Sequence, residues 1–387
     1  MTGPRRDSGG TVSGIDVQSG EGVRLHLRGG VIERTERGGR GPFVGPGLVD
    51  LQVNGFRGLD FNTLPVPADL PGDVTRELYK EGVTSYLATV ITNRPAAIEE
   101  SVRAIARACA ADPEASAAIV GIHLEGPFIA REDGPRGAHE KRYVRAPDWR
   151  LVRRWQEEAE GRIRLITMSP EWPGSIPFIR SCVANGIGVS IGHTAATPEQ
   201  VRGAVGAGAS LSTHLGNGAH LTLPRHPNYL WEQLAQDALR ACIIADGFHL
   251  PDSVIKVVMR VKGANAMLAS DAVYLSGLKP GRYTTHIGGK VVLTREGRLH
   301  LASNPRLLAG SVMMLRQGVD HLVKAGLCDL AEAWEMASTR PAGAIDLAAR
   351  RGLAPGAPAD FVVFERGKGR VRILETWKGG RLVHGGS

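Results

Sequence analysis

Seven short apolar runs, each ending in a polar or charged residue, constrain the fold of this chain more than any other feature of its sequence. The sharpest run, Ala118–Glu125, is β-branched and apolar until it stops at a carboxylate. Buried parallel strands look like this because helices cover the sheet. The seven runs end at Asn54, Glu125, Ser169, His193, His214, Asp246 and Asp271. We therefore predict parallel strands that alternate with helices and carry polar residues at their carboxyl ends.

Segments of helical composition separate these runs, and Thr84–Thr89 adds an eighth strand. Eight such repeats predict an α/β fold of the (β/α)₈ TIM-barrel type, in which all strand ends open into one mouth that holds the chemistry. Short alternating segments near both termini predict antiparallel strands outside the barrel. We expect a small β-sandwich domain built from residues 1–46 and 350–387, with residues 1–14 disordered, and a barrel catalytic domain over residues 47–349.

Charge and cysteine usage restrict the partners and the compartment. The net charge of +8 is scattered, without a cationic block and with few aromatic residues, so we expect anionic small molecules rather than nucleic acid. Four widely spaced cysteines without a C-x-x-C pair indicate reduced thiols in a cytoplasm. No apolar run approaches the roughly 20 residues of a membrane span, and the polar N-terminus lacks a signal-peptide core. We expect a cytoplasmic protein without a membrane partner.

Three of the run ends supply metal-ligand chemistry. Glu125, His193 and His214 would meet in the barrel mouth, and one carboxylate with two imidazoles is the environment of a catalytic zinc ion with an open position. Such an ion lowers the pKa of a bound water and polarises a carbonyl. Asp271 is placed as the general base and acid beside it. The alternatives are hydrogen-bonding histidines near turns and, for Asp271, an N-cap of the following segment.

The chain also resembles the amidohydrolase superfamily and, within it, the N-acetylglucosamine-6-phosphate deacetylase family. The likeness runs from about Val44 to Val383, and its motifs are specific as an ordered set rather than singly. They are PGLVDLQVNG from Pro46, HLEGPF from His123, GAH from Gly137, GHT from Gly192, THLGN from Thr213, IADG from Ile244, SDA from Ser270 and LAGS from Leu308.

The resemblance implies a metal-dependent hydrolase with Glu125, His193 and His214 as ligands and Asp271 as acid/base. The first-strand H-x-H of many amidohydrolases is here Gln52-Val53-Asn54, and two neutral amides replace imidazoles poorly. We therefore expect one divalent ion rather than two. Zinc is the expected ion, and iron, manganese and cobalt suit similar ligands.

The resemblance assigns five further residues to the substrate: His139, Asn217, Gly218, Arg225 and His249. His139 is expected at the sugar and His249 at the sugar or phosphate. The Arg225 guanidinium, the Asn217 side chain and the Gly218 backbone N–H are expected at the phosphate. This region departs from the family patterns T-H-L-[FY]-N-A-M and R-x-P-G, so a shifted substrate and a merely solvated Arg225 stay open.

The reaction implied is removal of the acetyl group from N-acetylglucosamine 6-phosphate, or a closely related N-acetylated amino sugar, to give acetate and the amino sugar phosphate. A homodimer is implied as well, with a phosphate contact from the neighbouring subunit. Two alternatives remain. One is another amidohydrolase reaction on the same barrel, by a deaminase, a cyclic-amide hydrolase or an N-acyl-amino-acid deacylase. The other is a catalytically silent sugar-phosphate-binding paralogue.

Overall fold

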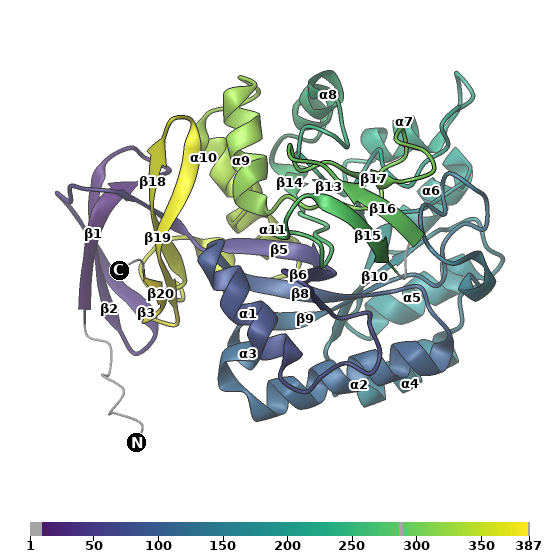
Figure 1. Cartoon of the computed structure of the whole chain (residues 1–387), viewed down its shortest axis with the longest axis horizontal. Coiled ribbons are helices and arrows are strands. Elements are labelled where there is room, and N and C mark those ends of the chain that lie inside the picture. The colour runs from purple at the N-terminus through teal and green to yellow at the C-terminus, as the bar shows by residue number, and fades with distance from the viewer. Residues whose placement is uncertain (1–9, 286–288, 386–387) are drawn as a thin grey trace. The chain divides into compact units, whose positions relative to one another are not determined.

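An eight-stranded sheet forms the centre of the computed structural model, which describes residues 10–285 and 289–385 (Figure 1). The strands follow one another in chain order around the sheet, and a parallel bridge from Val53 to Ala272 links its first strand to the residues after its last. The strands are β5 (Leu48–Val53), β8 (Val83–Ile91), β9 (Ile119–Glu125), β10 (Ile163–Met168), β11 (Gly188–Ile191), β12 (Leu211–Ser212), β13 (Arg240–Ile243) and β14 (Ala266–Leu268). The predicted (β/α)₈ barrel is confirmed.

The barrel strands are mostly hydrophobic because both of their faces are buried. All six residues of β5 and all nine of β8 are buried, including the polar Asp50, Gln52 and Thr89. A strand with one solvent-exposed face would alternate instead. The near-continuous apolar runs are thus the signature of a sheet that helices cover.

Helices connect the strands, and the sequence predicts several of their ends. Thr197 caps α6 in a full capping box with Gln200, and Asp148 caps α4. Helices α2 and α4 lie side by side on the outside of the sheet (Figure 1). The helices of this part of the chain are α1 (Leu70–Lys80), α2 (Pro95–Ala111), α3 (Pro113–Ala118), α4 (Trp149–Glu158), α5 (Ser175–Ala184), α6 (Pro198–Gly206), α7 (Tyr229–Ala235) and α8 (Asp252–Lys262), with 3₁₀ turns η1 (Lys141–Tyr143) and η2 (Gly263–Asn265).

A second sheet joins the two ends of the chain, as predicted. Its seven strands lie in the order β20-β19-β18-β4-β1-β2-β3, so the purple N-terminal strands lie beside the yellow C-terminal ones in Figure 1. Leu25, Ile32, Val44 and Phe361 are fully buried in its core. The strands are β1 (Gly10–Asp16), β2 (Gly22–Arg28), β3 (Val31–Arg37), β4 (Phe43–Pro46), β18 (Phe361–Gly367), β19 (Arg370–Lys378) and β20 (Arg381–Gly385).

The expectation that residues 1–14 are disordered is wrong for residues 10–14. These residues form most of β1, which pairs with β2 from Gly10 opposite Leu27 to Ile15 opposite Gly22. The backbone hydrogen bonds of a paired strand outweigh the weak signal of a Gly- and Ser-rich sequence. Residues 1–9 lie outside the described part of the chain.

Two smaller sheets follow barrel strands. β6 (Gly55–Phe56) pairs with β7 (Leu59–Asp60). The other is a three-stranded sheet of β15 (Gly281–Thr285), β16 (Gly289–Leu293) and β17 (Leu299–Leu301). Leu275, Val291 and Leu299 are buried in the cluster beneath it.

Three α-helices and a 3₁₀ turn follow this sheet. They are α9 (Leu315–Lys324), α10 (Leu330–Met336), α11 (Thr339–Ala344) and η3 (Ala348–Arg351). Proline has no N–H to donate and clashes with the preceding turn, so Pro341 is tolerated in the first turn of α11 but not within one long helix.

Packing divides the chain into two compact units. One comprises Met1–Asp50, Arg76–Ser85 and Leu315–Ser387, and the other comprises Leu51–Thr75 and Tyr86–Met314. The division into residues 1–46 with 350–387 and residues 47–349 stays a proposal. All four cysteines are free, and no helix in the described ranges is long and apolar enough to cross a membrane.

Candidate metal centre and substrate cavity

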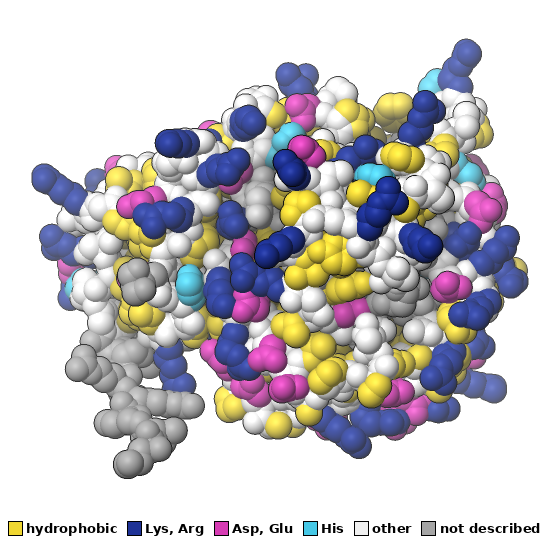
Figure 2. Space-filling view, viewed as in Figure 1, with side chains coloured by type: hydrophobic (Ala, Val, Ile, Leu, Met, Phe, Trp, Pro, Cys, Tyr) yellow, Lys and Arg dark blue, Asp and Glu magenta, His cyan; other side chains and the backbone are white. Residues whose placement is uncertain are grey.

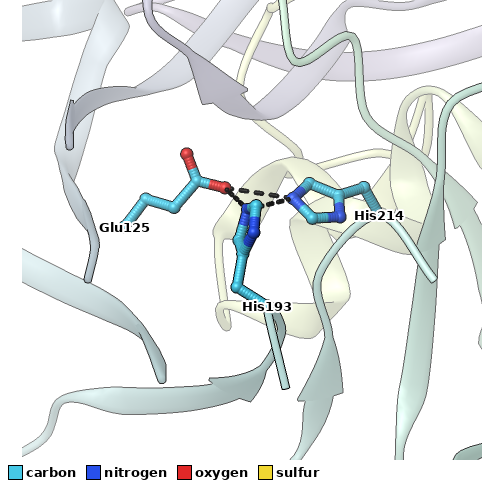
Figure 3. Close-up of side chains that lie close together, drawn as sticks. All are labelled: Glu125, His193 and His214. Atoms are coloured by element: carbon cyan, nitrogen blue, oxygen red, sulfur yellow. Dashed lines mark hydrogen bonds and ion pairs between the residues drawn. The ribbon is translucent and has the colours of Figure 1, made fainter. Parts of the chain in front are cut away.

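Three predicted ligands meet at the carboxyl ends of neighbouring barrel strands. Glu125 is the last residue of β9, and His193 and His214 lie two residues beyond β11 and β12. Figure 3 shows their side chains pointing at one another. One ligand atom from each lies within 4.8 Å of the others, and all three residues are buried. The sequence therefore located the members of a candidate metal site.

The hydrogen bonds around His193 fit a metal ligand. Its Nδ1 lies 2.8 Å from the carbonyl oxygen of Pro135, which only accepts, so Nδ1 carries the proton and the lone pair of Nε2 faces inward. That Nε2 lies 3.2 Å from Glu125 Oε1 and 3.0 Å from His214 Nε2. Since lone pairs at these distances repel, either protons or a cation must lie among these atoms. The donor set of one carboxylate and two imidazoles suits a divalent ion.

The electrostatics of the cluster agree. Burial by itself would raise the pKa of Glu125, but the close contacts of its carboxylate with His193 and His214 hold that pKa well below its usual range. Burial would lower the pKa of His214, yet its contact with the Glu125 carboxylate raises it. The site therefore concentrates one negative charge and demands positive charge beside it, which a divalent ion provides.

A chain of hydroxyl groups supports the site. His123 donates from Nδ1 to the Leu51 carbonyl at 2.9 Å, so its Nε2 accepts from Thr167 Oγ1 at 2.7 Å. Thr213 must then donate to Thr167 and Ser190 to Thr213, each at 2.6 Å. Burial lowers the pKa of His123 to about 4, so the imidazole is neutral near pH 7. A neutral His123 accepts at Nε2, and this sets the direction of every hydrogen bond in the series. Thr213 precedes His214, so the network holds the backbone that presents this ligand.

Asp271 is tied to the same cluster through two amides. Its Oδ1 accepts from Gln52 Nε2 at 2.9 Å and from Asn54 Nδ2 at 2.8 Å, and Gln52 Nε2 also donates to Glu125 Oε1 at 2.7 Å. Burial, and then the negative charge of Glu125, raise the pKa of Asp271 to about 6. A carboxylate with a pKa near neutrality suits a group that takes and returns a proton.

Gln52 and Asn54 have a role that the sequence did not reveal. The sequence suggests only that they are poor replacements for imidazole ligands. In the structure, their side-chain amides donate hydrogen bonds that orient Asp271. The signal available in the sequence was that both amides lie at the end of the first barrel strand. The sequence does not show that they bind Asp271, because that residue lies 219 positions from Gln52 along the chain.

Backbone strain is concentrated at this site. His193, His214 and Asp271 have φ angles of 50°, 29° and 49°, in a region that residues with a side chain rarely occupy. They are three of the seven such non-glycine residues in the described chain. Each conformation of this kind costs roughly 1–3 kcal/mol and persists where the surrounding structure over-determines it. The strand ends are thus bent to aim these side chains inward.

A cavity of about 850 Å³ opens over the cluster. Four of the five predicted substrate residues line it: His139, Asn217, Gly218 and His249. Arg225 is exposed and is not among the lining residues. Its assignment to the phosphate therefore stays a prediction.

The lining residues are held in different ways. His139 Nε2 lies 3.2 Å from His193 Nε2, and burial, then His193, lower the pKa of His139 to about 3. His249 Nδ1 lies 2.6 Å from the carboxylate of Asp246, a strand-end residue to which the sequence gave no role. Gly218 must be glycine, because a Cβ there would lie 2.6 Å from His193 Nδ1. Arg298 and Arg306, which the sequence did not single out, also line the cavity.

Comparisons with known proteins agree with this geometry. The sequence profile of the Amidohydrolase family matches residues 43–383. An N-acetylglucosamine-6-phosphate deacetylase of Lysinibacillus sphaericus is 30% identical over 362 residues, covering 93% of this chain and 90% of the relative. The human enzyme of that name is 33% identical over 365 residues, covering 91% and 85%. A mutant of the Mycobacterium smegmatis deacetylase in complex with N-acetyl-D-glucosamine-6-phosphate superposes with a TM-score of 0.84 at 26% identity, covering 94% of each chain.

Proposed function

Because the chain belongs to the amidohydrolase family, we propose that it is a metal-dependent deacetylase of N-acetylglucosamine 6-phosphate. The products are acetate and glucosamine 6-phosphate. The observation that carries the proposal is the meeting of Glu125, His193 and His214 within 4.8 Å, with Asp271 tied to the same carboxylate through Gln52. A linear amide needs a polarised carbonyl, a water nucleophile and a proton for the leaving amine. An ion held by the three ligands would supply the first two, and Asp271 would supply the proton.

Glu125, His193 and His214 hold one divalent ion, with zinc as the proposed metal and iron, manganese or cobalt as alternatives. When bound, the ion polarises the acetyl carbonyl and lowers the pKa of a water molecule. The Pro135 carbonyl accepts from His193 Nδ1 and so fixes the tautomer in which Nε2 would be free to bind the ion. Two neutral amides at residues 52 and 54 are engaged with carboxylates, which favours a single ion.

Asp271 moves the protons. Its carboxylate takes a proton from the attacking water and then gives it to the departing amine, while Gln52 and Asn54 keep one of its oxygens in place. The amine must be protonated to leave, since an amide anion is a far poorer leaving group. His139, Asn217, Gly218 and His249 line the cavity and are proposed to bind the sugar phosphate.

The test is acetate release from N-acetylglucosamine 6-phosphate by the purified protein, with bound metal measured in the same sample. We expect one ion per chain and release of one acetate per glucosamine 6-phosphate. A panel of a hydantoin, an N-acyl amino acid and an aminopurine covers other amidohydrolase reactions. Turnover of one of these, with none of the sugar phosphate, would refute the proposal. A protein that binds no metal and hydrolyses no amide would be a silent paralogue.

We propose a cytoplasmic homodimer as the working form. Large apolar side chains are exposed on neighbouring helices: Trp231 on α7 and Val254, Val257 and Val261 on one side of α8, with 55%, 38%, 44% and 51% of their surface accessible. Burying such a face against a second copy is favourable. Arg225 is exposed, so in a dimer its guanidinium is available to the partner's cavity. Light scattering measures the mass in solution. We expect a dimer for wild type and a monomer for the double variant Trp231→Ser/Val257→Ser. A monomeric wild type would refute the proposal.

A further inference from the structure

The permanent positive charges in the cavity come from one place. Of its lining residues, which all lie in the described ranges, two are arginine and none is lysine. Arg298 lies in the turn that precedes β17, and Arg306 lies in the loop that leaves this three-stranded sheet. The chain also carries Arg282, Lys290 and Arg295 in this sheet and its turns, and Lys and Arg side chains are spread over the whole face shown in Figure 2. Of the three carboxylates in the lining, Glu125 and Asp271 lie at the buried end, and Asp133 at the exposed end is paired with Arg136.

The fold fixes the loop that presents Arg306. The backbone N–H of Leu301 donates to the Leu307 carbonyl at 3.0 Å, and that of Ala309 donates to Leu299 at 3.1 Å. Arg298 closes the loop from the other side, because its Nη2 donates to the Pro305 carbonyl at 2.7 Å. The Arg306 backbone N–H donates to Asn304 Oδ1 at 3.0 Å. The backbone of Arg306 is therefore held at the cavity by several independent bonds.

The side chain of Arg306, by contrast, is uncommitted. Within the described residues its guanidinium makes no hydrogen bond or ion pair, although many other arginines of the chain are paired, as Arg136 is with Asp133 and Arg316 with Glu81. A guanidinium offers five N–H donors in a planar fork that matches phosphate and carboxylate oxygens. Arg298 uses one donor on Pro305, which leaves others for a ligand.

An unpaired donor also faces the cavity from another element. Asn217 lines it, and the side-chain Nδ2 of Asn217 is buried without a hydrogen-bond partner in the described structure. A buried amide donor of this kind costs free energy unless a ligand accepts from it. Both the amide and the guanidinium are donors of the kind from which an oxygen-rich anion accepts.

We propose that Arg306, positioned by Arg298, binds the phosphate of the substrate within the same chain. This inference rests on the proposed function, since it names the residue that selects the phosphorylated sugar. It places a phosphate contact in cis, whereas Arg225 lies outside the cavity of its own chain. Arg306 then determines specificity, and Arg298 acts through the loop that carries it.

The test compares Arg306→Gln with Arg295→Gln, a matched control on the same sheet that does not line the cavity. With N-acetylglucosamine 6-phosphate we expect the KM of Arg306→Gln to rise about 10- to 100-fold, because a hydrogen bond to a charged group is lost, while kcat is kept. Activity on unphosphorylated N-acetylglucosamine should not change, and Arg306→Lys should recover part of the loss. An unchanged KM in Arg306→Gln, or an equal loss on both sugars, would overturn the proposal.

Direct binding separates this inference from the proposed function. Calorimetry with glucosamine 6-phosphate and with glucosamine needs no turnover. If wild type releases no acetate but binds glucosamine 6-phosphate more tightly than Arg306→Gln does, the cis site stands and the deacetylase proposal fails. If wild type is active and both proteins bind glucosamine 6-phosphate equally, the cis site fails and the deacetylase stands. A loss confined to Arg225→Gln would likewise assign the phosphate to that residue and overturn the cis site.

Discussion

The two ends of the cavity are built on different principles. At the buried end, Glu125 and His214 are 4% and 2% exposed, and strands, amides and hydroxyl groups fix their side chains. At the other end, Leu221 is 86% exposed and Arg306 has no side-chain partner in the described structure. The buried end is held by many contacts, whereas at the exposed end the backbone is fixed and the Arg306 side chain is left available to a ligand.

This difference separates the residues that carry out the reaction from the residues that determine which substrate binds. Strained residues at positive φ, such as His193 and Asp271, hold a reacting geometry that tolerates little change. Loop residues at the exposed end can differ between relatives without disturbing it. Substitutions at the buried end should therefore affect metal content and kcat, and those at the exposed end should affect KM.

The largest effect is expected for His193→Ala. Removing one of three ligands should reduce bound metal from one ion per chain towards zero and acetate release to background, because the ion supplies several kcal/mol of transition-state stabilisation. Mass spectrometry of the metal and an acetate assay measure both. The control at the exposed end is His220→Ala, which should keep the ion and kcat. A His193→Ala protein with full metal content would mean that the cluster is not the metal site.

Asp271→Asn comes next. It removes the group that transfers protons but keeps an oxygen to accept from Gln52 and Asn54, so kcat should fall about 10²- to 10⁴-fold with metal retained. Steady-state kinetics and metal analysis on one preparation give the answer. The carboxylate control, Asp133→Asn, lines the cavity near its exposed end and should keep kcat. Wild-type kcat in Asp271→Asn would remove Asp271 from the mechanism.

A smaller loss of metal affinity and activity is expected for Gln52→Met. This change keeps the side-chain size and removes the amide that lies between Glu125 and Asp271. Residues that orient metal ligands typically contribute about 10- to 100-fold in metal affinity or activity. Competition with a chelator measures the affinity, and thermal unfolding checks that the barrel is intact. Unchanged affinity and unchanged kcat/KM would show that the bridge is incidental.

The smallest effect concerns stability against pH. In metal-free protein, the pKa of Asp271 is raised from 3.8 to about 6, so Asp271 adds stability below about pH 4 that is lost as pH rises through 6. Metal-free Asp271→Asn lacks this dependence. Its free energy of unfolding relative to that of wild type should therefore increase by about 1–3 kcal/mol between pH 4 and 7. Denaturant unfolding of both proteins at several pH values measures the difference. A constant difference across that range would mean that Asp271 does not titrate as inferred.

The sequence by itself determined the barrel and the members of the metal site. Continuous apolar runs have few alternatives to buried parallel strands, and parallel strands bring their carboxyl ends together, so Glu125, His193 and His214 had to be neighbours. These properties are local or follow from topology. They need no knowledge of how any one side chain is oriented.

Only the tertiary structure decided what surrounds that site. The amide bridge at Gln52, the hydroxyl chain below His214, the partner of His249 and the positions of Arg225 and Arg306 depend on contacts between residues far apart in the chain and on loop conformations. A one-residue shift in a loop reverses which side chain faces the cavity, and no periodicity records it. Residues in strands are fixed by their repeat, whereas residues in loops are fixed by what they happen to touch.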